Sequence, residues 1–157
     1  MNAMNARSGM PGIERHQIPG LFLRAVPEAR AGIEAQAGRP AEAAVTRSAD
    51  WFDLYDFLRE VAYRGVIKPA LLTPEAERDT ELLSRCAQFT EELLVNSSET
   101  VASAAFFQLI EPLYASEDLL IAAIPLMLPQ TLHATLEDLA VDRLSTQTQA
   151  ALAPYLP

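Results

Sequence analysis

The fold is decided first by one stretch of sequence, ADWFDLYDFLREVAYRG at residues 49–65. Its apolar side chains recur every three or four residues: Trp51, Leu54, Tyr55, Leu58, Val61 and Ala62. That spacing places all six on one face of an α-helix, whereas the alternation of a β-strand would divide them between two faces. We therefore predict a helix over residues 49–64, capped by Ser48 or Asp50 and ended by Gly65.

The same period predicts four further helices along the chain. The second is expected to begin at Thr73 and Pro74, as N-cap and first helical residue. Its apolar stripe comprises Leu82, Leu83, Cys86, Phe89, Leu93 and Leu94. The others are expected over residues 99–114, 117–128 and 130–144, with Pro112 either kinking or ending the first of them. Because the connections are short, the sequence predicts an all-α fold, a compact bundle of about five helices.

Residues 1–48 differ from the rest of the chain in composition and charge. They hold five of the six glycines, and six arginines with four glutamates give them a net charge of +2. We expect a flexible, poorly ordered N-terminal segment with at most one short helix. Residues 49–157 carry a net charge of −11 and are expected to form an acidic helical domain.

The acidity bears on the classes of partner. A negative field repels nucleic acid phosphates and anionic lipids and attracts basic proteins. The longest apolar stretch, residues 119–129, is too short to span a bilayer. We therefore expect a basic protein partner, with neither nucleic acid nor membrane bound. One cysteine, Cys86, and no visible secretory signal favour a cytoplasmic location.

The chain lacks the residue patterns of common chemistry. Two distant histidines, His16 and His133, and one cysteine make no metal site, and no nucleophile motif or phosphate-binding glycine loop is present. We expect no catalytic residue, no metal and no cofactor. Cys86 is interpreted as a core residue, and His133 as half of an ordinary surface pair with Glu137.

Two acidic rows are the candidate binding surface. On the first helix, Asp53, Asp56 and Glu60 lie opposite the apolar stripe, with Phe52 and Tyr63 beside them. Aromatic side chains near carboxylates are typical of a site for a basic partner, unless other helices or the N-terminal segment cover the two rings. On the second helix, Glu77 and Glu81 lie with Glu91 and Glu92 away from the stripe, where the alternative is an ordinary solvated face with a Glu81–Arg85 pair. The candidate partner-binding residues are Phe52, Asp53, Asp56, Glu60, Tyr63, Glu77 and Glu81.

Residues 51–140 resemble a family of uncharacterised bacterial all-α proteins that are similar to immunity proteins of polymorphic toxin systems. The resemblance rests on Leu71-Leu72, Phe89, Leu93-Leu94, Val95-Asn96-Ser97, Phe106-Phe107, Ile110-Glu111-Pro112-Leu113, the segment 126–129 and Thr135-Leu136. It implies a helical, non-enzymatic protein that binds and neutralises a toxin.

Three functions follow as hypotheses. The first is a non-enzymatic protein-binding domain that neutralises a basic partner, as an immunity protein would. The second is a homo-oligomeric helical scaffold subunit that associates through the apolar run 119–128 or through Phe106 and Phe107. The third is a small-ligand-binding bundle, in which kinks at Pro112 and Pro125 open a pocket between the third and fourth helices.

Overall fold

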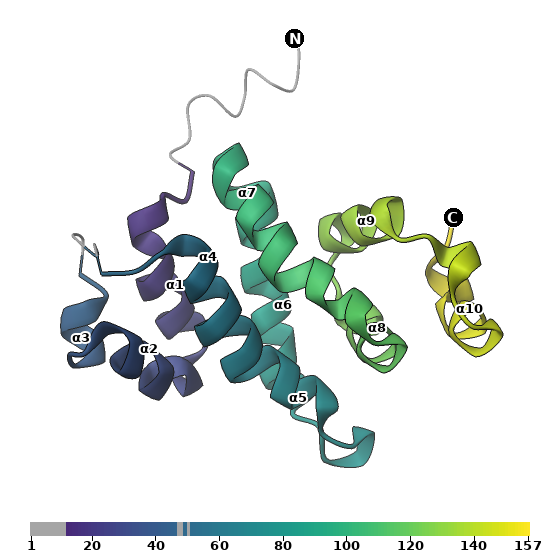
Figure 1. The fold of residues 1–157 in the computed structure, drawn as a ribbon, viewed down its shortest axis with the longest axis horizontal. Helices are drawn as coiled ribbons and strands as arrows, with labels where there is room; N and C mark the ends of the chain where they lie inside the picture. Colours follow the sequence, from purple (N-terminus) through teal and green to yellow (C-terminus); the bar gives the residue numbers. More distant parts are fainter. Residues whose placement is uncertain (1–11, 47–48, 50) are drawn as a thin grey trace, which may run out of the picture.

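The computed structural model describes residues 12–46, 49 and 51–157 of the chain. Helices form the regular structure of these residues, and no β-strand occurs among them. Their single β-type contact is an isolated parallel bridge between Ile13 and Ser97. The prediction of an all-α protein is thereby confirmed (Figure 1). The expected caps Ser48 and Asp50 lie outside the described residues.

Residues 12–46 are mostly helical, although we expected a flexible segment with at most one short helix. They form η1 (Arg15–Gln17), α1 (Ile18–Ala25), η2 (Pro27–Ala29), α2 (Arg30–Ala37) and α3 (Ala41–Ala44), where η1 and η2 are 3₁₀ turns. Ile18 and Phe22 of α1 and Ile33 of α2 are buried in the same hydrophobic cluster as the later helices. The expected flexibility is wrong for residues 12–46, because their apolar side chains pack against the rest of the chain.

One long helical run over residues 54–72 replaces the first predicted helix. It consists of α4 (Leu54–Asp56), the π-helical segment η3 (Phe57–Ile67) and α5 (Lys68–Leu72). Asp53 is its N-cap, because its carboxylate accepts a hydrogen bond from the backbone N–H of Asp56 at 2.9 Å. Gly65 does not end the helix but lies within η3, where a Cβ atom would stand 3.0 Å from the carbonyl oxygen of Glu60.

The second predicted helix begins later than expected. Thr73 and Pro74 precede a 3₁₀ turn, η4 (Glu75–Glu77), and α6 covers Thr80–Val95. Asp79 is the actual N-cap, and its carboxylate accepts a hydrogen bond from the N–H of Leu82 at 3.0 Å. The apolar stripe is confirmed. Its buried side chains are Leu83, Cys86, Phe89 and Leu93, and the half-buried Leu82 and Leu94 pack against the core.

The third predicted helix changes its geometry along its length. α7 (Glu99–Ala105) continues into the π-helical segment η5 (Phe106–Ile110) and then into the 3₁₀ segment η6 (Glu111–Ala115). Ser98 caps α7, since its hydroxyl accepts a hydrogen bond from the N–H of Val101 at 3.2 Å. Pro112 lies in the first turn of η6, so the run tightens at the proline instead of stopping there.

The last third of the chain consists of shorter segments than predicted. They are α8 (Glu117–Ala123), η7 (Ile124–Leu126), α9 (Pro129–Asp138), η8 (Val141–Arg143), α10 (Thr146–Leu152) and η9 (Ala153–Tyr155). Leu119, Leu120 and Ile124 are buried, so the apolar run lies in the core. The prediction that Pro129 ends the fourth helix is wrong: α8 ends at Ala123, η7 ends at Leu126, and Pro129 is the first residue of α9.

The helices pack around α6 and the two long runs. α6 contacts α1, α7 and α9, while η3 packs against η5, so the two π-helical segments lie side by side. α5 contacts α8, and α10 contacts α8 at the C-terminal end of the molecule (Figure 1). The described residues contain more and shorter helices than the predicted five.

Candidate functional site

Two of the three carboxylates in the predicted acidic row on the first helix form ion pairs with arginines. Asp53, Asp56 and Glu60 are exposed, as expected. Asp56 forms an ion pair with Arg59, and Glu60 accepts hydrogen bonds from Arg59 at 3.0 Å and from Arg64 at 2.8 Å. The bond to Glu60 raises the pKa of Arg59 above its ordinary value. This row therefore presents two carboxylates already paired with two arginines, and one that caps a helix.

The two aromatic side chains predicted beside this row are buried. Phe52 is 4% exposed and Tyr63 is 5% exposed. The ring of Phe52 packs 5.5 Å from that of Trp51 and 5.7 Å from that of Phe57, and the guanidinium of Arg15 lies 4.9 Å above its face. Burial raises the pKa of Tyr63. The alternative that other parts of the chain cover both rings is therefore the one found: Phe52 precedes the helix and packs in the core, with Arg15 of the N-terminal segment over its ring.

The carboxylates predicted near the start of the second helix are exposed. Glu81 accepts a hydrogen bond from Arg85 at 3.0 Å, which confirms the predicted pair. Arg85 also donates to Glu28 at 2.7 Å and to the carbonyl oxygen of Ala25 at 2.9 Å, so it ties α6 to the N-terminal helices. These bonds raise the pKa of Arg85 and lower the pKa of Glu28. Glu77 is exposed and takes part in none of them.

Two glutamates cap the N-termini of other helices. Glu91, expected on a solvated face of the second helix, accepts a hydrogen bond from the N–H of Thr131 in α9 at 2.7 Å. Glu117 likewise accepts one from the N–H of Ser145, the N-cap of α10, at 2.7 Å. Carboxylates at helix N-termini satisfy free N–H groups and favour the helix dipole. Part of the acidity of this chain therefore serves the fold.

Three exposed carboxylates lie near an exposed apolar side chain in the turn between α5 and α6. Glu75, Glu77 and Asp79 are exposed, and the adjacent Leu72 is 57% exposed. The ion pairs among the described residues include none of these carboxylates. Arg78 lies within the turn, but its side chain is half-buried and donates to the carbonyl oxygen of Thr73 at 3.2 Å. We call Leu72, Glu75, Glu77 and Asp79 the acidic turn.

Sequence reasoning missed most of the acidic turn. Thr73 and Pro74 resemble a helix start, and a helix that began there would hold Glu75 and Asp79 in its first two turns. The available signal was Asp79 itself, which stands three residues before Leu82, the spacing at which an N-cap carboxylate accepts a backbone N–H.

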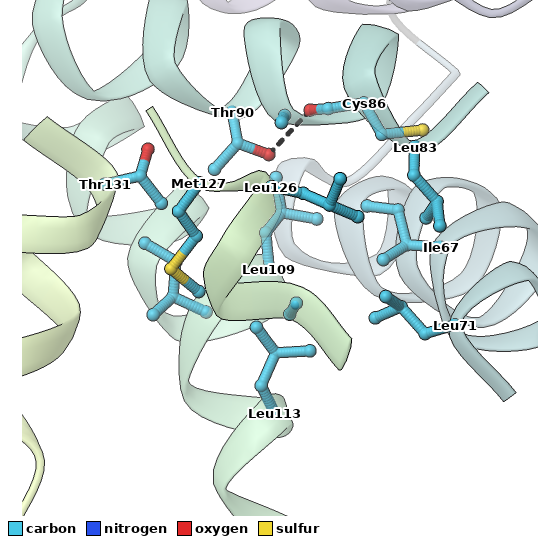
Figure 2. Close-up of a pocket in the computed structure, with 13 residues that line it drawn as sticks. Ile67, Leu71, Leu83, Cys86, Thr90, Leu109, Leu113, Leu126, Met127 and Thr131 are labelled. Carbon is cyan, nitrogen blue, oxygen red and sulfur yellow. Dashed lines mark hydrogen bonds between the residues drawn. The ribbon is translucent and has the colours of Figure 1, made fainter. Parts of the chain in front are cut away.

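A second candidate site is a partly open apolar cavity of about 50 Å³ between the helices (Figure 2). Its wall combines Ile67 and Leu71 from the first long run, Leu109 and Leu113 from the second, and Leu126 and Met127 around the end of η7. On the α6 side, Thr90 donates a hydrogen bond to the carbonyl oxygen of Cys86 at 3.0 Å, the dashed line in Figure 2. Burial raises the pKa of the Cys86 thiol to about 12, and its side chain is a core residue as predicted.

The remaining polar groups add no cluster of functional residues. His133 and Glu137 are exposed and lie 3.3 Å apart, which confirms the expected surface pair. Among residues 12–46, 49 and 51–157, no group of three or more His, Cys, Asp or Glu side chains is arranged to hold a metal ion. The helices of this part of the chain include none with the length and apolar character needed to cross a bilayer.

Comparisons with models of protein families, with curated proteins and with solved structures find no match to this chain.

Proposed function

We propose that this chain is a protein-binding domain that holds a basic protein on its acidic turn and neutralises it, in the manner of a toxin-immunity protein. The observation that carries the proposal is the exposed Leu72 beside the exposed carboxylates of Glu75, Glu77 and Asp79. A cytoplasmic location belongs to the same proposal.

Charge supports this choice of surface. The chain has a net charge of −9, and Arg59, Arg64 and Arg85 are engaged with carboxylates elsewhere. Among the described residues, Glu75 and Glu77 take part in no ion pair, while Asp79 caps α6. Glu75 shares a groove with Arg78 and with the exposed Asp118 of α8. Exposed carboxylates accelerate encounter with a basic surface.

The arrangement of apolar and charged groups supports binding of a protein rather than of a free cation. Stable interfaces have an apolar centre surrounded by a polar rim. Leu72 supplies an apolar contact, and the exposed Glu75 and Glu77 supply carboxylates near it. Phe52 and Tyr63 no longer belong to the proposed surface, because both are buried.

Association kinetics test the proposal with the full chain and a purified basic protein that it retains at physiological salt. The double reversal Glu75→Lys/Glu77→Lys should lower the association rate constant by roughly tenfold. Glu99→Lys/Asp142→Lys, at exposed positions on α7 and η8, changes net charge by the same amount and should have a smaller effect. Leu72→Ser should mainly raise the dissociation rate. Equal losses in both double variants would reject the acidic turn as the interface.

A homo-oligomeric subunit is the second candidate function, and one of the two features that suggested it still supports it. Phe107 is 48% exposed, and its ring meets that of Phe106 edge to face at 5.7 Å. The apolar run 119–128 no longer supports it, since its large side chains at 119, 120 and 124 are buried. Light scattering should then detect dimers that Phe107→Ser abolishes, and a monomer at high concentration would reject this function.

A further inference from the structure

We propose that the cavity between α6, η5 and η7 is a binding site for a small uncharged apolar ligand, such as a short hydrocarbon group. Three features of the cavity support this inference: its apolar wall, the helical geometry around it and its size.

The wall offers a ligand almost no polar partner. The hydroxyl of Thr90 is used by the carbonyl oxygen of Cys86, and the hydroxyl of Thr131 donates to Glu91 at 2.9 Å. Among the described residues, no buried polar side-chain atom lacks a hydrogen-bond partner. A buried water requires two to four polar partners, so this site favours a hydrocarbon over water.

The helical geometry around the cavity is unusual. π-Helical turns are rare and are frequently found at functional sites. Here two of them lie side by side, and both end at the cavity: Ile67 is the last residue of η3, and Leu109 and Ile110 are the last residues of η5. Protein interiors are normally packed with few voids larger than a water molecule. The position of this partly open apolar cavity at the ends of two widened helices points to a built space.

Size limits the ligand. The cavity measures about 50 Å³, whereas an engineered apolar cavity of about 150 Å³ binds benzene. Met127 lies in the wall, and an unbranched methionine adapts its shape more readily than leucine or isoleucine. The size therefore favours a xenon-sized group, and binding of benzene requires the cavity to enlarge, for which Met127 is the adaptable wall residue.

Methyl NMR spectra of the full chain test the proposal with xenon and benzene as probes. Both should produce saturable shifts of the Met127 and Ile67 methyl resonances, while Ile33, which does not line the cavity, should be unaffected. Phenol, which adds one hydroxyl to benzene, should bind at least tenfold more weakly. Comparable binding of phenol would overturn the apolar selectivity, and no saturable shift with either probe would overturn the site.

Cavity-filling variants give the matched test. Ala123→Leu adds three carbons in the wall, and Ala87→Leu does so at a half-buried lining position that tolerates bulk if the first variant fails to fold. Either folded variant should weaken the benzene-dependent shifts by at least tenfold, whereas Ala150→Leu on the exposed face of α10 should leave them unchanged. Full retention of the shifts in a folded filling variant would overturn the assignment.

Discussion

Glu91 of α6 caps α9 through Thr131, a residue forty positions later in the chain. One carboxylate oxygen accepts hydrogen bonds from the N–H and the hydroxyl of Thr131 at 2.7 and 2.9 Å, and the other accepts one from the N–H of Gln130 at 3.1 Å. The residue before α9, Leu128, makes no side-chain cap bond. The N-terminus of α9 therefore depends on a carboxylate supplied by another helix.

Removal of this carboxylate should destabilise the protein. Glu91→Ala leaves two backbone N–H groups and a hydroxyl without their acceptor, and we expect a loss of about 1.5–3 kcal/mol in the free energy of unfolding. Urea denaturation measures it. Glu92→Ala is the matched control, because Glu92 is exposed and bonds only to the side chain of Asn96. Equal losses in the two variants would contradict the capping role.

The Arg85–Glu28 ion pair should make stability depend on pH. Hydrogen bonds from Arg85 lower the pKa of Glu28 below its ordinary value of 4.5. A carboxyl group with a lowered folded-state pKa contributes stability above its unfolded pKa and loses it as pH falls through the folded pKa. The difference in unfolding free energy between the wild type and Glu28→Gln should thus be constant near neutral pH and shrink below about pH 4.5.

The control for this pH dependence uses the other partner. In an Arg85→Leu background, the Glu28 carboxyl loses the largest contribution that lowers its pKa and keeps the backbone hydrogen bond, so the effect of Glu28→Gln should depend less on pH. An undiminished dependence in this background would show that Arg85 is not responsible.

The Cys86 thiol should be unreactive in the folded protein. Burial raises its pKa to about 12, so near pH 8 its thiolate fraction is roughly 10³-fold below that of a free cysteine. A disulfide reagent such as DTNB should label the folded chain at least that much more slowly than the chain in denaturant. Rapid labelling under native conditions would instead indicate an accessible thiol.

Two glycines in helices should respond oppositely to alanine. At Gly32 in α2, a Cβ atom would meet Val61 at an ordinary 3.6 Å, so Gly32→Ala should stabilise the protein by about 0.5–1 kcal/mol. At Gly65 the Cβ would stand 3.0 Å from a backbone oxygen within the π-helical segment. Gly65→Ala should therefore lower the midpoint of thermal unfolding, while Gly32→Ala raises it. Stabilisation by both would show that η3 accommodates the added Cβ.

The helical class and the buried faces could be predicted because they depend on local periodicity. The stripe of α6 from Leu83 to Leu93 follows from the 3.6-residue period alone, whatever packs against it. Helix starts were harder to predict, since Thr73 and Asp79 both have side chains that can cap a helix. The π-helical segments had no sequence signal that distinguishes them from α-helix.

The candidate surface was only partly predictable. The exposure of Asp56, Glu60, Glu77 and Glu81 follows from the cost of burying a charge. The burial of Phe52 could not be predicted from the helical pattern, because Phe52 precedes α4 and its ring is covered in part by Arg15, thirty-seven positions earlier in the chain.

The sequence by itself thus determined that the chain is all-α, that its later part is acidic and which stripe of α6 is buried. Hydrophobic periodicity and charge are properties of short segments, so they can be determined from the sequence without knowledge of the fold. Only the tertiary structure decided which carboxylates remain unpaired at the acidic turn. It also decided that Glu91 holds α9 and that the two long helical runs enclose a cavity, because these relationships join residues from distant parts of the chain.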